Sequence, residues 1–213
     1  MWDFKTNMYK TKNMQPDTYY HIYNRANGSV NLFRNDENYR YFLQQWVKYT
    51  EPIAETYVYC LMPNHFHVLI KIKNDDTLTE FFKNRNKDLT GFENLSGLVS
   101  QQFSNFFNSY AKAYNKMFGR NGSLFNRPFK AKSITSDSYL TNVIFYIHHN
   151  PVHHGFTKHI EDWPHCSYHA MLSEKETFLL RKDVIDWFGD KEAFIRLHKQ
   201  SLQELEKQET KFT

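Results

Sequence analysis

The stretch LMPNHFHVLIKIK, residues 61–73, decides how this chain is interpreted. Successive side chains of a β-strand point to opposite faces of a sheet, so a strand here places His65 and His67 together and turns Phe66 the other way. The preceding MPN turn contains Pro63, which cannot donate a backbone hydrogen bond, and it separates this strand from an earlier one. Two imidazoles on one face can share a metal ion, although a single histidine in a strand is more often a packing residue.

Position 69 narrows the kind of metal site. An H-x-H-x-D metallohydrolase needs an acidic residue there, and a histidine-triad nucleotide hydrolase needs a third histidine. The residue is Leu69, which excludes both patterns. A two-histidine site therefore needs further ligands from elsewhere in the fold.

The order of predicted elements is β-α-β-β-α-β-α. Apolar periodicity and capping signals predict strands, helices and a polar excursion with a short helix. The strands span 18–25, 54–61, 65–73 and a basic stretch ending near 134; helices span 36–49 with Asp36 as N-cap, 95–118, 137–150 and 190–207, and the excursion spans 74–94. This order predicts an α+β fold, an antiparallel sheet with helices packed on it and a C-terminal helical appendage.

Composition excludes several classes. Of the 213 residues 40% are apolar and 17% aromatic, enough for a sizeable core. No apolar run approaches the roughly 18 residues of a membrane span, and the N-terminal residues lack the apolar region of a signal peptide. The cysteines, Cys60 and Cys166, are too few for a disulfide framework, so a reducing cytoplasm is expected.

Charge is unevenly distributed along the chain. The net charge is only +4, yet residues 94–136 contain no Asp or Glu. Such a cluster is often a plain solvated face, but over some forty residues it favours a nucleic-acid partner. The candidates for DNA backbone contacts are Arg25, Lys112, Lys116, Arg120, Arg127, Lys130 and Lys132. Phe125 and Phe129 could stack on bases, but packing against the core is the more ordinary role.

The second informative stretch is TNVIFYIHHNPVHHG, residues 141–155. On a helical wheel Tyr146 lies beside the apolar stripe, and Asn150 follows it four residues later on the same side. His149 competes with Asn150 as a polar neighbour. Pro151 is expected to end the helix. The histidines at 148, 149, 153 and 154 could form a second metal cluster, but a basic surface is favoured.

Together these motifs resemble a known family. YCLMPNHFHVLIKI, GSLFNRPFK, YLTNVIFYIHHNPVHHGF and DWPHCSY are similar, in order and spacing, to the REP-associated tyrosine transposases. These form a group within the single-tyrosine transposase branch of the HUH endonucleases, named for histidine–hydrophobe–histidine. The resemblance covers residues 18–172. It implies a catalytic domain over residues 1–172, with 74–94 as an insertion and 173–213 as the appendage.

The resemblance also implies a fold and a set of site residues. The fold is ferredoxin-like, with the histidine pair on a central strand and the nucleophile on a C-terminal helix. His65 and His67 become ligands of Mg²⁺ or Mn²⁺, and Tyr146 becomes the nucleophile. Asn150 matches the position of a further ligand, where the related branch carries glutamine.

The implied activity is cleavage and rejoining of single-stranded DNA near hairpins through a 5′-phosphotyrosine intermediate. The partner would be hairpin-containing single-stranded DNA in the cytoplasm, at the nucleoid, with no membrane involved. A monomer and a homodimer both remain open, as does the group that activates the phenol. Two alternatives remain: a domesticated hairpin-DNA-binding protein, and a hydrolase that uses water and does not need Tyr146.

Overall fold

The computed structural model of the chain describes residues 14–85 and 92–199. At its centre lies a four-stranded antiparallel sheet in the order β2-β3-β1-β4. Its strands are β1 (Tyr19–Arg25), β2 (Ala54–Met62), β3 (His65–Ile72) and β4 (Lys130–Ile134). This order with helical crossovers is the ferredoxin-like arrangement, so the predicted α+β fold is confirmed.

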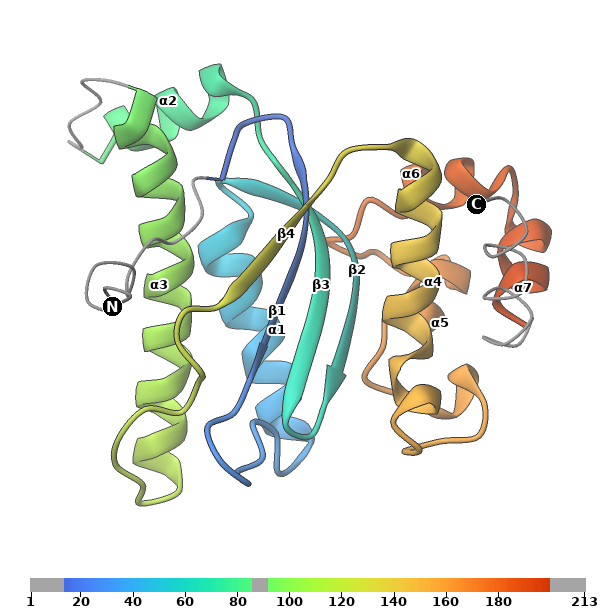
Figure 1. Ribbon diagram of the computed structural model, residues 1–213, viewed down its shortest axis with the longest axis horizontal. Coiled ribbons are helices and arrows are strands. Elements are labelled where there is room, and N and C mark those ends of the chain that lie inside the picture. Colours follow the sequence, from blue (N-terminus) through green and yellow to red (C-terminus); the bar gives the residue numbers. More distant parts are fainter. Residues whose placement is uncertain (1–13, 86–91, 200–213) are drawn as a thin grey trace, which may run out of the picture.

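Helices cover both faces of the sheet (Figure 1). On one face lie α1 (Asp36–Thr50) and α3 (Phe92–Met117), and on the other lies α4 (Asp137–His153). Phe66 points into the α1–α3 core, where it packs against Phe42. β3 is therefore buried on both sides, which explains its nearly continuous apolar sequence.

The start of α1 differs from the prediction by one residue. Asn35 is the N-cap, and its side chain accepts a hydrogen bond from the backbone N–H of Asn38. Asp36, which was predicted as the cap, is instead the first helical residue. Asn and Asp cap helices about equally well, so the sequence pattern alone could not choose between the neighbours.

The polar excursion contains the short helix that was expected there, α2 (Asp75–Lys83). Residues 86–91 of this excursion lie outside the described part of the chain. The aromatic residues on one side of α3 belong to the core: Phe103, Phe106 and Tyr110 are almost completely buried. None of the helices in residues 14–85 and 92–199 combines the length and the apolar character needed to cross a bilayer.

The expectation that Pro151 ends the tyrosine-bearing helix is wrong. α4 begins after its N-cap Ser136 and continues through Pro151 to His153. Proline removes one backbone donor, the one that would reach the carbonyl of Ile147, and here the loss falls in the last turn. The backbone N–H of His154 still donates to the Asn150 carbonyl at 2.9 Å, so this turn closes.

Residues after α4 pack beside it rather than apart from it. They form η1 (Ile160–Asp162), α5 (Tyr168–Leu172), α6 (Arg181–Phe188) and α7 (Lys191–His198). Val184 and Phe194 are fully buried in the same cluster as Ile144 of α4. The final helix was predicted over residues 190–207. In the structure Asp190 is the N-cap of α7, and the helix ends at His198. Residues 200–207 of the predicted helix lie outside the described part of the chain.

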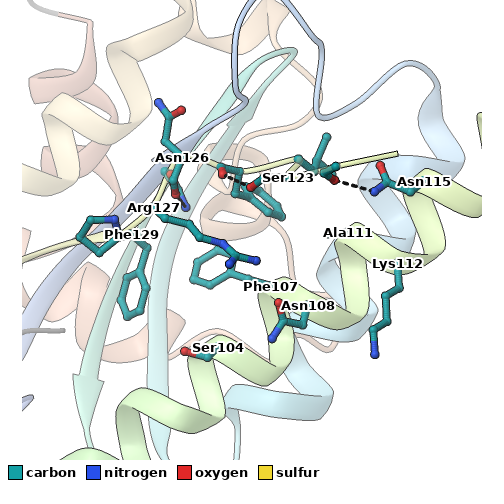
Figure 2. A pocket seen from close by; sticks show the side chains of 15 residues that line it. Ser104, Phe107, Asn108, Ala111, Lys112, Asn115, Ser123, Asn126, Arg127 and Phe129 are labelled. Atoms are coloured by element: carbon teal, nitrogen blue, oxygen red, sulfur yellow. Dashed lines mark hydrogen bonds between the residues drawn. The ribbon is translucent and has the colours of Figure 1, made fainter. Parts of the chain in front are cut away.

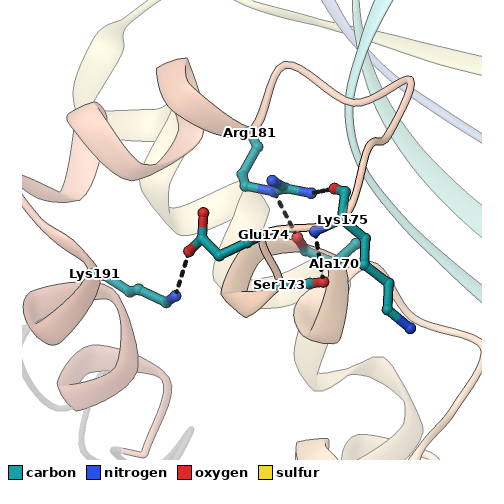
Figure 3. Close-up of polar contacts among 6 residues, drawn as sticks. All are labelled: Ala170, Ser173, Glu174, Lys175, Arg181 and Lys191. Carbon is teal, nitrogen blue, oxygen red and sulfur yellow. Dashed lines mark hydrogen bonds and ion pairs between the residues drawn. The ribbon is translucent and has the colours of Figure 1, made fainter.

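Polar contacts join these last elements to one another (Figure 3). The Nε of Arg181 donates to the Ala170 carbonyl at 2.7 Å, and Lys191 pairs with Glu174 at 3.3 Å. The domain boundary after residue 172 stays a prediction, and the helices beyond it share their core with α4 and β2.

Candidate metal and nucleophile site

The histidine pair lies near the start of β3, a central strand of the sheet. In the β1–β3 register His65 faces Arg25 and His67 faces Tyr23. Both imidazoles lie on the sheet face that α4 covers, opposite to Phe66. His67 is buried and His65 is half-buried.

The ring of His65 is oriented by its neighbour. Its Nδ1 lies 2.6 Å from Oδ1 of Asn64, and since the amide oxygen can only accept, Nδ1–H donates. The other ring nitrogen, Nε2, is buried and has no hydrogen-bond partner among the described residues. In this tautomer Nε2 carries a free lone pair, which is what a metal ligand needs.

His67 is oriented by a residue that the sequence did not single out. Its Nδ1 lies 2.8 Å from Nε2 of His21 on β1, and both side chains are buried. When His67 Nδ1–H donates to His21, the Nε2 of His67 is free to bind a metal. As a single histidine in a strand, His21 would ordinarily be a packing residue. Its signal, a histidine diagonal to His67 on the same face, becomes visible only with the strand register.

All three imidazoles are held in the neutral form. Burial, assisted by the nearby His154 and Arg25, lowers the pKa of His65 to about 4. Burial and then Lys132 lower the pKa of His21 to about 4. The pKa of His67 is also well below its usual value, first through burial and then through its histidine neighbours. Neutral rings keep their lone pairs at physiological pH, as metal binding requires.

α4 brings the predicted nucleophile to these histidines. Tyr146 is 43% exposed, and its ring centroid lies 5.6 Å from that of His67 and 5.9 Å from that of His21. Two turns further along the helix, the His154 ring lies 4.7 Å from the His65 ring. One side of α4, from Tyr146 to His154 just after its end, therefore lies against His67 and His65.

Asn150 lies between these two contacts, at the middle of the i, i+4, i+8 series. Its Nδ2 donates to the Tyr146 carbonyl at 2.8 Å, which fixes the orientation of the amide. Its Oδ1 is buried and has no partner among the described residues. The amide oxygen and His65 Nε2 are thus two of the three buried side-chain polar atoms left unpartnered there.

The donor set fits a divalent metal with a mixed shell. No group of three or more His, Cys, Asp or Glu side chains in residues 14–85 and 92–199 is placed to hold a metal ion. A site on the histidine pair therefore needs another kind of donor, and the Asn150 oxygen is unengaged. Two imidazole nitrogens and one amide oxygen suit Mn²⁺ and, less well, the harder Mg²⁺.

His149, the competing candidate, contacts a different part of the molecule. Its ring stacks on Phe145 at 3.7 Å, its Nδ1–H donates to the Phe145 carbonyl, and it faces His198 of α7. His148 also contacts His198. The expectation of a basic histidine surface is wrong for these two, which are 0% and 6% exposed, because α7 covers that side of α4.

The predicted DNA-binding cations lie in three parts of the structure. Lys130 and Lys132 lie opposite Tyr23 and His21 in the β1–β4 register, so they are on the same face of the sheet as the histidines. Their strand, β4, is at the edge of the sheet. Arg25 is opposite His65. Lys116 is exposed on α3, whereas Arg120 donates to Asn115 and to the Ser123 carbonyl and so holds the loop after α3.

The remaining two cations, Lys112 and Arg127, line a cavity of about 560 Å³ (Figure 2). It lies between α3 and residues 122–129, on the face of the sheet opposite to the histidines. Phe125 is 4% exposed and packs on Phe107, as its core interpretation predicts, while Phe129 is only partly buried.

A ferredoxin-like sheet with a histidine–hydrophobe–histidine pair facing a helical tyrosine is the arrangement expected of the HUH class. No family model matches the chain. A curated Haemophilus influenzae protein, provisionally named a REP-associated tyrosine transposase, is 28% identical over 118 residues, which is 54% of this chain. The chain matches 59% of that protein's length.

The same name occurs among solved structures. A REP-associated tyrosine transposase bound to a REP hairpin superposes with a TM-score of 0.56 at 17% identity, over 78% of this chain and 85% of the other. At that identity the superposition shows a shared fold. Together the two comparisons confirm the family resemblance that the motifs indicated.

Proposed function

We propose that this chain is a metal-dependent single-stranded DNA nicking and joining enzyme, a tyrosine transposase that acts beside DNA hairpins. The observation that carries the proposal is the placement of Tyr146 over His67, with unpartnered donor atoms on His65 and Asn150. The hairpin substrate is proposed because the solved structural neighbour is bound to a REP hairpin.

The proposed reaction is a transesterification. The Tyr146 phenolate oxygen attacks the scissile phosphorus in line, the Tyr–O–P bond forms and the P–O3′ bond breaks. The leaving oxygen takes a proton and becomes a 3′-OH, while the 5′-phosphate stays on the tyrosine. Because the phosphodiester is conserved, a 3′-OH of another strand can reverse the step and join the DNA.

His65, His67 and Asn150 would hold the metal ion. The bound ion supplies polarisation of a non-bridging phosphate oxygen. His21 and Asn64 orient the two imidazoles through the hydrogen bonds described above. Lys130 and Lys132, on the same face at the sheet edge, would neutralise neighbouring phosphates without reading bases.

The test uses a hairpin with single-stranded flanks, taken from DNA beside the gene and labelled at its 3′ end. In Mn²⁺ the wild-type protein should produce a labelled protein–DNA adduct on a denaturing gel. The adduct should disappear in Tyr146→Phe, in His65→Ala and on addition of EDTA. Tyr49→Phe, a tyrosine change on the opposite face of the sheet, is the matched control and should retain it.

Two results would contradict the proposal. Cleavage that persists in Tyr146→Phe without an adduct would assign the attack to water and identify a hydrolase. Binding of the hairpin without cleavage in any divalent ion would instead support a domesticated hairpin-binding protein.

A further inference from the structure

We propose that the cavity between α3 and residues 122–129 binds one unpaired nucleobase of the same DNA strand that is cleaved at Tyr146. This inference rests on the proposed function and adds to it a second contact, on the other face of the sheet.

The cavity combines an aromatic wall with hydrogen-bonding groups. Phe107 and Phe129 have ring centroids 5.1 Å apart, and Phe129 is only partly buried. Asn108 is exposed on α3, and Figure 2 shows Arg127 extending toward it from the opposite wall. Aromatic rings stack on any base, and amide groups can pair with base edges.

The charge of the rim fits a nucleotide rather than a plain apolar ligand. Lys112 and Arg127 are exposed, and within the described part of the chain neither is in an ion pair. Every residue that lines the cavity, apart from Asn24, comes from the stretch 94–136, which has no acidic residue. The two cations are thus available to the phosphates on either side of a bound base.

The cavity adjoins the candidate active site through the end of β1. Asn24 lines the cavity and donates from Nδ2 to the Asn126 carbonyl at 3.1 Å. The next residue, Arg25, accepts a backbone hydrogen bond from Asn126 and faces His65 in the register. One DNA strand can therefore pass from the histidine face, along Arg25, to the cavity.

The test measures binding alone, by fluorescence anisotropy, in a Tyr146→Phe background that cannot cleave. The probe is the hairpin with its single-stranded flanks, and abasic sites are introduced at one flank position at a time. We expect one position at which loss of the base weakens binding about 5- to 150-fold, the range for one base–aromatic stack. In Asn108→Ala and Phe129→Ala the same abasic site should have a much smaller effect, because the contact is already lost.

Arg127→Ala should weaken binding of the intact probe, because a cation beside the bound base is lost. Lys83→Ala, which removes an exposed cation on α2, is its matched control and should bind like the parent. If every abasic site binds alike, or if the cavity variants remain as sensitive as the parent, the base-binding inference is wrong even where Tyr146 still forms its adduct. If the hairpin does not bind at all, the inference and the proposed function both fail.

Discussion

Asn64 and His21 each engage one nitrogen of a predicted metal ligand and leave the other free. Asn64 accepts from His65, and His21 pairs with His67 at 2.8 Å. Outer-shell partners of this kind fix the tautomer and the ring direction before a metal arrives. Their contribution to metal binding can therefore be measured separately from catalysis.

The first prediction concerns His21→Leu. Removing the partner of His67 should weaken Mn²⁺ binding about 10- to 100-fold, because the ring loses its orientation. Calorimetric titration of the protein with Mn²⁺ measures this without DNA. His159→Leu, at an exposed histidine, should bind Mn²⁺ like wild type. Unchanged affinity in the His21 variant would remove His21 from the metal site.

At this scale the sequence predicts what local geometry determines. The placement of His65 with His67 follows from strand alternation, and the pairing of Tyr146 with Asn150 follows from helix periodicity. His21 could not be predicted, because its contact depends on which strand pairs with β3 and in what register. The free Oδ1 of Asn150 depends in turn on an amide orientation that only the packed helix sets.

At the scale of elements, α4 is joined to α7 by a buried histidine chain. His198 Nδ1–H donates to the Phe194 carbonyl, which leaves its Nε2 to accept from Nδ1–H of His148 at 2.9 Å. Both hydrogen bonds form when the two rings are neutral. A proton added to His198 Nε2 would point at the N–H of His148 Nδ1, and the hydrogen bond between the two rings would be lost. Burial lowers the pKa of His198 to about 3.

The second prediction is that the buried His148–His198 pair makes the stability of the folded protein sensitive to acid. In the unfolded chain His198 is protonated below about pH 6.5, whereas in the folded protein it is protonated only below about pH 3, because its pKa is lowered. This stabilisation is complete above pH 6.5 and is lost as pH falls, by about 1.4 kcal/mol per unit. Urea unfolding at several pH values should show a shallower loss in His198→Phe.

The control for this comparison is His159→Phe, which should lose stability on acidification as steeply as wild type. Equal slopes in the His198 variant and wild type would contradict the assignment. Other buried histidines, such as His21, titrate in both proteins, so only the difference between slopes is diagnostic.

The end of α4 marks a limit of prediction at this scale. Proline is a reliable signal where a full helix would follow, because it removes a donor and crowds the preceding turn. Only two further residues of helix follow Pro151, and its neighbour Asn150 is completely buried. Tertiary packing therefore extends the helix past a residue that local preference would treat as its end.

At the scale of the whole molecule, the C-terminal helices complete the core beneath α4. Phe194 is fully buried, and its ring lies 4.0 Å from that of His198 and 5.7 Å from that of Tyr168. Leu179 forms a parallel bridge to Thr56 of β2, which connects this segment directly to the sheet. These contacts were beyond the motifs of residues 18–172, so sequence resemblance could not supply them.

The third prediction is that Phe194→Ala destabilises the whole protein by about 3–5 kcal/mol, as expected for a large cavity in a shared core. Thermal unfolding followed by circular dichroism should show one transition at lower temperature. Lys182→Ala, an exposed residue on α6, should leave the midpoint almost unchanged. Two separate transitions, with only one shifted, would instead support an independent unit after residue 172.

The long separation between the histidine pair and Tyr146 has a consequence for how the molecule is made. A ribosome delivers residues 65 and 67 first and the tyrosine about eighty residues later, at about 5–20 residues per second. For those seconds the nascent chain contains the two predicted histidine ligands but neither Tyr146 nor Asn150. Prematurely released fragments that stop before α4 likewise have no means of attaching to DNA through Tyr146, so the proposed reaction begins only when synthesis has passed this helix.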